Sequence, residues 1–91
     1  MKIIFGPTGS DQYQYWRQSD DEICAKIDML ISEMRRTPFL GLGKPEPLKG
    51  DRKGEWSRRI NDEHRLVYRV FGKHPEQFLE IVSCRYHYTK K

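Results

Sequence analysis

Glycine and proline residues crowd one internal stretch of the chain, between Thr37 and Gly54. Because Gly adds backbone freedom and Pro removes an N–H donor, no regular element of useful length fits into this stretch. We therefore expect a long loop, and its apolar residues favour an ordered one. These anchors are Phe39, Leu40, Leu42 and Leu48. The loop divides the chain into a part with helical patterns and a part with strand patterns.

The part before the loop predicts one short strand and two helices. Residues 2–5 form an apolar run that Gly6 and Pro7 close, as is typical of a first strand. A first helix is expected over residues 11–18. A second and stronger helix should begin at Ser19, with Ser19 as N-cap and Glu22 reaching back to it, and run to the Arg35-Arg36 pair. One face of this helix is apolar at helical spacing, through Ile23, Ile27, Leu30, Ile31 and Met34.

The part after the loop predicts three strands, over residues 56–60, 64–71 and 78–88. Their connections are short, so they should form an antiparallel meander. We expect an α+β fold in which the N-terminal strand and two helices pack on one face of a small antiparallel sheet. Residues 1–91 are too few for more than a single domain.

Period-two alternation predicts which strand residues share a side of this sheet. Arg65 should share a side with Val67, Arg69 and Phe71, opposite His64, Leu66, Tyr68 and Val70. In the last strand, Ser83, Arg85 and His87 should lie together. Trp56 is better interpreted as a core or interface residue than as a platform for stacking bases.

Charge is unevenly divided between the two parts. Residues 1–43 carry a net charge of −1 and residues 44–91 a net charge of +5, within a total of +4. The second part should therefore be the one that meets a polyanion.

Other features narrow the class of protein. No apolar run approaches the roughly 20 residues of a membrane span, so we expect a cytoplasmic protein. Cys24 and Cys84 lack a C-x-x-C pair, and His64 and His74 lack partners at metal spacing. Two reduced thiols, no metal and no cofactor are expected.

The side chains needed to cleave RNA through its own 2′-hydroxyl are present in the basic part. Such a reaction needs a proton acceptor, a proton donor and cations around the phosphate. Glu46 between two prolines and the sequence Arg85-Tyr86-His87-Tyr88 supply these groups.

Five ordered segments along the chain resemble the YoeB family of RelE-like toxins from bacterial toxin-antitoxin pairs. They are Arg35-Arg36-Thr37-Pro38-Phe39, Gly43-Lys44-Pro45-Glu46-Pro47-Leu48-Lys49, Trp56-Ser57-Arg58-Arg59-Ile60, His64-Arg65-Leu66-Val67-Tyr68 and Cys84-Arg85-Tyr86-His87-Tyr88. The resemblance implies a RelE-like, microbial-RNase-like fold and a ribosome-dependent endoribonuclease that cuts mRNA in the A site. It also implies inhibition by a YefM-type antitoxin, and relatives form homodimers.

The same resemblance assigns roles to individual residues. It implies that Glu46 is the general base, His87 the general acid and Arg65 the phosphate ligand, while Tyr88 helps to shape the site. Lys49 and Arg59 match further cationic positions, and we include Arg58 and Arg85 as candidates for binding RNA. Taken singly, each of these residues has an ordinary interpretation, such as a solvated Glu or a strand Arg that covers apolar surface.

Two departures from the family pattern stand out. The 72–77 connection looks longer than usual, and the chain continues past Tyr88 with Thr89-Lys90-Lys91. Two alternative functions stay open, namely a toxin of ParE type that acts on gyrase without RNA cleavage, and a basic module that only binds RNA or a partner protein.

Overall fold

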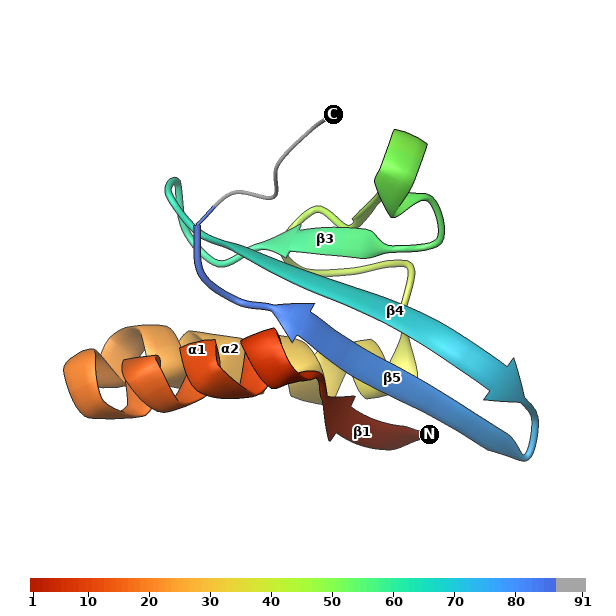
Figure 1. Cartoon of the computed structure of the whole chain (residues 1–91), viewed down its shortest axis with the longest axis horizontal. Helices are drawn as coiled ribbons and strands as arrows, with labels where there is room; N and C mark the ends of the chain where they lie inside the picture. The colour runs from red at the N-terminus through yellow and green to blue at the C-terminus, as the bar shows by residue number, and fades with distance from the viewer. Residues whose placement is uncertain (87–91) are drawn as a thin grey trace.

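Two helices cover one face of a five-stranded sheet in the computed structural model, which describes residues 1–86 (Figure 1). The strand order in the sheet is β1-β5-β4-β3-β2. The α+β fold with both helices on one face was predicted from the sequence, and it is confirmed. His87, Tyr88 and the residues after them lie outside the described part of the chain.

Three strands form the predicted antiparallel meander at the centre of the sheet. They are β3 (Trp56–Arg59), β4 (Arg65–Lys73) and β5 (Glu76–Ser83). The edges differ from the expected sheet. On one side β1 (Lys2–Phe5) pairs in parallel with β5, which makes the sheet mixed. On the other side a two-residue strand, β2 (Glu46–Pro47), pairs with β3 inside the segment expected to be a loop.

Both helices begin at positions that differ from the predicted ones. α1 (Pro7–Ser19) starts four residues early, because Pro7 occupies the first turn, where its missing N–H costs nothing. α2 (Asp21–Arg36) was expected to be capped by Ser19, and this was wrong. Asp20 is the N-cap, and its carboxylate accepts from the backbone N–H groups of Glu22 and Ile23 at 3.1 and 3.2 Å.

The core lies between the helices and the sheet. Its buried residues are Trp16, Ile27, Leu30, Met34, Ile60, Leu66, Tyr68, Leu79, Ile81 and Cys84. Helix α1 packs closely on β5 because Gly9 has no side chain. A Cβ atom at Gly9 would overlap the carbonyl oxygen of Ile81. Trp56 packs against this core and against the ring of Phe39, with centroids 4.6 Å apart, as predicted for a packing residue.

The last strand is shorter than predicted. β5 ends at Ser83 instead of Tyr88, and the register with β4 shifts where Val67 pairs with Ser83 but Tyr68 pairs with Ile81. The alternation that grouped Ser83 with Arg85 therefore does not apply beyond the strand end. Arg69 lies directly opposite Glu80 on β5 and forms an ion pair with it at 2.6 Å.

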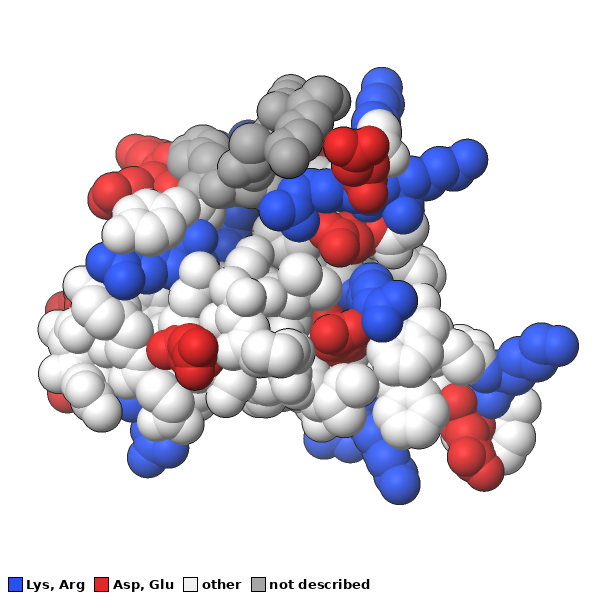
Figure 2. Space-filling view, viewed as in Figure 1, with Lys and Arg blue, Asp and Glu red and all other residues white. Residues whose placement is uncertain are grey.

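Charged side chains gather over the part of the molecule that holds β2, the short η1 (Gly50–Arg52) and β3 (Figure 2). Most of the side chains seen there are basic. Among the described residues, neither helix is long and apolar enough to cross a membrane. The cysteines Cys24 and Cys84 are both free.

Candidate active site

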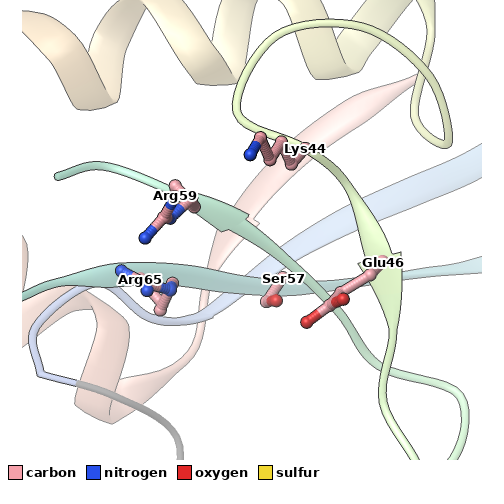
Figure 3. Close-up of a pocket in the computed structure, with 5 residues that line it drawn as sticks. All are labelled: Lys44, Glu46, Ser57, Arg59 and Arg65. Atoms are coloured by element: carbon pink, nitrogen blue, oxygen red, sulfur yellow. The ribbon is translucent and has the colours of Figure 1, made fainter. Parts of the chain in front are cut away.

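An open pocket of about 250 Å³ lies over β2, β3 and the start of β4 (Figure 3). All five lining residues have polar or charged side chains, namely one carboxylate, one hydroxyl and three cations. The lining residues are Lys44, Glu46, Ser57, Arg59 and Arg65.

The strand register brings these side chains to one face of the sheet. Glu46 on β2 lies directly opposite Ser57 on β3, and Arg59 on β3 lies directly opposite Arg65 on β4. Ser57 and Arg59 are two residues apart, so their side chains point to the same side of β3. Two arginines that face each other across strands repel, and this arrangement destabilises a sheet unless an anion binds between them. The pocket therefore has an excess of positive charge, which suits an anionic group.

The turn between β3 and β4 holds the side chain of Arg65 in place. Nη1 of Arg65 donates to the backbone carbonyls of Asn61 at 2.6 Å, His64 at 3.1 Å and Asp62 at 3.4 Å. The turn is itself fixed, because the side-chain oxygen of Asn61 accepts from the N–H groups of Glu63 and His64 at 2.9 and 2.7 Å. The Arg65 side chain that lines the pocket is therefore held by a turn that is itself fixed.

Lys44 reaches the pocket because the loop before β2 has an unusual backbone. Gly43 and Lys44 both have positive φ angles, of 82° and 51°, and Lys44 adopts this left-handed conformation although it has a side chain. The N–H of Arg59 donates to the carbonyl of Gly43 at 2.7 Å, which ties the loop to β3. A Cβ at Gly43 would lie 3.1 Å from both Arg58 Cβ and Arg59 O, so Gly suits the close approach.

Sequence analysis predicted three of the five lining residues, Glu46, Arg59 and Arg65, and the fold brings them together. It missed Lys44 and Ser57. A period-two reading of β3 could have found Ser57, which lies two residues before Arg59. It could not have found Lys44, which precedes β2 and has a left-handed backbone. Lys49, a predicted phosphate-binding residue, is the exposed N-cap of η1 and does not line the pocket. His87 and Tyr88, the other predicted catalytic residues, lie outside the described residues.

Arg58 was predicted to bind RNA, but the structure buries it completely, so this assignment is wrong. Its guanidinium donates to three loop carbonyls, those of Thr37 at 2.6 Å, Leu40 at 2.7 Å and Leu42 at 3.0 Å. Nε donates to the Tyr68 hydroxyl at 3.2 Å, and Glu33 forms an ion pair at 3.7 Å. Arg58 therefore fixes the loop before the pocket and contacts no substrate.

The phenol of Tyr68 belongs to the same buried network. Its hydroxyl donates to the carbonyl of Pro38 at 2.5 Å while accepting from Arg58. Burial raises the pKa of Tyr68, and the hydrogen bond and the charge of Arg58 oppose that rise. The phenol is therefore a neutral structural group.

Arg85, another predicted RNA-binding residue, does not line the pocket. Its guanidinium carbon lies 3.7 Å from the centre of the Tyr15 ring and 4.6 Å from that of Tyr86. These are cation–π distances. Nε of Arg85 is buried without a hydrogen-bond partner among residues 1–86.

The pocket provides groups for acid–base chemistry on a phosphate. Glu46 can accept a proton, and Lys44, Arg59 and Arg65 can stabilise negative charge beside it. Within residues 1–86, no three His, Cys, Asp or Glu side chains lie together so that they could hold a metal ion.

Comparisons with known proteins agree with this fold. Residues 5–88 match the model of the YoeB-like toxins of bacterial type II toxin-antitoxin systems. The chain is 52% identical to toxin YoeB of Escherichia coli K12 over 97% of its own length and 100% of that toxin. A solved YoeB/ParE toxin from Agrobacterium tumefaciens has 52% identity and a TM-score of 0.92, over 97% of this chain and 100% of that one.

YoeB of Staphylococcus aureus has been solved both as a dimer and in a heterotetrameric complex with YefM. The two structures are 43% and 42% identical to this chain, each with a TM-score of 0.84 over 97% of this chain and 98% of the other. With a family match over nearly its whole length, the chain belongs to the YoeB-like toxins of bacterial type II toxin-antitoxin systems.

Proposed function

We propose that this toxin is a ribosome-dependent endoribonuclease that cuts mRNA in the ribosomal A site and thereby inhibits translation. The observation that carries the proposal is the pair of opposed arginines, Arg59 and Arg65, in one pocket with the carboxylate of Glu46. A scissile phosphate bound between the arginines would relieve their repulsion and present its neighbouring ribose to the carboxylate.

The proposed reaction proceeds through proton transfers by side chains, without a metal or cofactor. Glu46 takes the proton of the 2′-hydroxyl, and the 2′-oxygen then forms a bond to phosphorus. The bond between phosphorus and the 5′-oxygen breaks, which leaves a 2′,3′-cyclic phosphate on one fragment and a 5′-hydroxyl on the other. Arg65, Arg59 and Lys44 stabilise the extra charge on the phosphate oxygens as the new bond forms.

Two further roles rest on the family resemblance. His87 would give its proton to the leaving 5′-oxygen, and Tyr88 would help to shape the site around it. Tyr86, the residue before His87, has its carbonyl oxygen 3.1 Å from the backbone nitrogen of Arg65. Tyr86 is therefore held beside a residue that lines the pocket. Lys49 and Arg85 would contact RNA away from the reacting phosphate.

Partners follow from the relatives. The S. aureus complex supports a YefM-type antitoxin as the neutralising partner of this toxin, and the S. aureus dimer supports a homodimer. A basic pocket also suits an acidic antitoxin segment that blocks access to RNA. The proposal places the protein in the cytoplasm, where it would meet the ribosome and mRNA.

The test is cleavage of a defined mRNA by purified protein, with and without programmed ribosomes. Wild type should produce discrete cuts only with ribosomes. Glu46→Gln keeps the shape of the side chain but removes the base, so it should lower the rate by about 100-fold or more. Glu76→Gln makes the same change at the exposed start of β5 and should cleave as wild type does.

The two alternative functions predict different results. A gyrase-directed toxin would leave mRNA intact and inhibit supercoiling by gyrase. A binding-only module would remain toxic after Glu46→Gln. Either result, obtained with folded protein, overturns the nuclease proposal.

A further inference from the structure

The segment that follows β5 is held by side chains and by the first residue of β4, not by regular strand pairing. Residues 84–86 lie beyond the end of β5 at Ser83. The first of them, Cys84, is held by helix α1. Its N–H donates to Oε1 of Gln12 at 2.7 Å, and its carbonyl accepts from Nε1 of Trp16 at 2.8 Å.

Tyr86 is held from the other side, by the first residues of β4 and the turn before it. Its N–H donates to Nδ1 of His64 at 2.7 Å, and its carbonyl accepts from the N–H of Arg65 at 3.1 Å. The φ angle of Tyr86 is 66°, in the left-handed region that residues with side chains seldom occupy. Such a conformation persists only where the surroundings fix it, and it is common at functional sites.

The His64 side chain is buried, and its Nδ1 accepts a hydrogen bond that an apolar side chain could not accept. It is 6% exposed and contacts the Trp16 ring edge-to-face, with centroids 4.8 Å apart. Because Nδ1 accepts from the Tyr86 amide, the proton of the neutral ring must be on Nε2. Nε2 lies 3.6 Å from the carboxylate of Glu63.

We propose that His64 is a positioning residue of this toxin, whose Nδ1 fixes the Tyr86 backbone beside Arg65. The inference rests on the nuclease proposal, in which Arg65 holds the scissile phosphate. Arg65, whose backbone holds the carbonyl of Tyr86, also lines the pocket. His64 thus links the last described residue to a phosphate-binding side chain without contacting substrate.

Two substitutions separate this role from simple packing. In His64→Asn, Oδ1 takes the place of Nδ1 and can accept from the Tyr86 amide, but the ring is lost. In His64→Leu, apolar volume is kept and the acceptor is lost. A packing role predicts that Leu is tolerated better than Asn. A positioning role predicts the reverse order.

The experiment measures kcat for ribosome-dependent cleavage by wild type, both His64 variants and His74→Leu. The last variant makes the same chemical change at an exposed position in the hairpin between β4 and β5. His64→Leu should lower kcat by about tenfold or more, His64→Asn should recover most of the loss, and His74→Leu should match wild type.

A readout that needs no activity accompanies the assay. In ¹⁵N-labelled toxin, His64 should show the tautomer with the proton on Nε2, and the Tyr86 amide should exchange slowly with solvent. That protection should disappear in His64→Leu and persist in His64→Asn. An inactive wild type with these spectra would count against the nuclease and leave the Tyr86 contact established. A wild-type rate in His64→Leu, or a proton on Nδ1, would overturn the positioning role.

Discussion

Arg58 and Arg59 are neighbours in the sequence, yet one is wholly buried and the other lines the pocket. Successive residues of a strand point to opposite faces of the sheet, so the two side chains leave β3 in opposite directions. Arg58 ties the loop that precedes the pocket, whereas the Arg59 side chain is 44% exposed. The same residue type is therefore part of the buried structure at one position and lines an open pocket at the next.

Replacing Arg58 by Met should destabilise the protein severely. The substitution removes a buried charge and leaves the carbonyls of Thr37, Leu40 and Leu42 without their donor. Buried acceptors that lose a partner and a broken buried ion pair together cost about 3 kcal/mol or more. Urea denaturation monitored by circular dichroism measures the change in the free energy of unfolding.

Arg59→Met is the matched control, because it makes the same change on the open side of β3. Its free energy of unfolding should stay within about 0.5 kcal/mol of wild type. Equal losses for Arg58→Met and Arg59→Met would contradict the distinct roles of the two residues.

The burial of Arg58 shows where sequence reasoning about the site reaches its limit. Alternation along β3 separates Arg58 from Arg59, but it does not say which side faces the helices. Arginine is seldom fully buried, so exposure was the reasonable expectation for both residues. The carbonyls that accept hydrogen bonds from Arg58 belong to a loop whose shape depends on positive φ angles at Gly41 and Gly43. The pattern of residues does not specify these angles.

The elements that were predicted well are those with local signals. The apolar face of α2 and the short turns of the meander are visible within a few residues of sequence. The parallel pairing of β1 with β5 joins Ile3 to Leu79, and no local pattern encodes such a contact. For the same reason the roles of Glu46 and Arg65 were proposed from family resemblance, and Lys44, with its φ angle of 51°, emerged only from the pocket itself.

The N-cap of α2 can be tested by a pair of alanine substitutions. Asp20→Ala removes the acceptor for two backbone N–H groups and should lower the free energy of unfolding by about 1 kcal/mol. Ser19→Ala should change it by a few tenths at most, because Ser19 is the last residue of α1. Thermal denaturation of both variants measures the difference, and a larger loss for Ser19→Ala would restore the predicted capping box.

Alkaline pH should destabilise the fold through Cys84. Burial raises the pKa of this thiol from 9.0 to about 12. Above pH 9 the unfolded chain loses the thiol proton while the folded chain keeps it, so the folded state binds more protons and its stability falls as pH rises. The loss should continue until the pH passes the folded pKa near 12.

Urea midpoints measured between about pH 8 and 11 test this dependence. Cys84→Ala lacks the thiol, so its midpoint should fall less steeply with pH than that of wild type. The remaining slope belongs to Tyr13 and Tyr68. The hydrogen bond to Asp28 raises the pKa of Tyr13, and burial raises that of Tyr68. Identical slopes in wild type and Cys84→Ala would exclude the thiol as a cause.

Repulsion between the opposed residues Arg59 and Arg65 should destabilise the sheet, and salt should weaken this repulsion. Like charges directly across a strand pair destabilise a sheet by a few tenths to about 1 kcal/mol. The ion pair of Arg59 with Asp62 is long, at 3.8 Å, and solvent-exposed, so it offsets little of this repulsion. Arg59→Gln should therefore unfold at a higher urea concentration than wild type in about 0.02 M salt, and the difference should vanish near 0.5 M.

The same variant should cleave ribosome-bound mRNA more slowly, because it has lost one of the two guanidinium groups placed to hold the phosphate. If Arg59→Gln is more stable and less active than wild type, the repulsion between Arg59 and Arg65 is explained as a cost of placing both arginines where they bind the phosphate. Asp62→Asn offers the control, since it weakens the exposed ion pair while keeping both arginines, and it should change neither quantity by much. If Arg59→Gln were less stable than wild type at low salt, the two arginines would stabilise the fold. That result would contradict the view that their repulsion is a cost of binding phosphate.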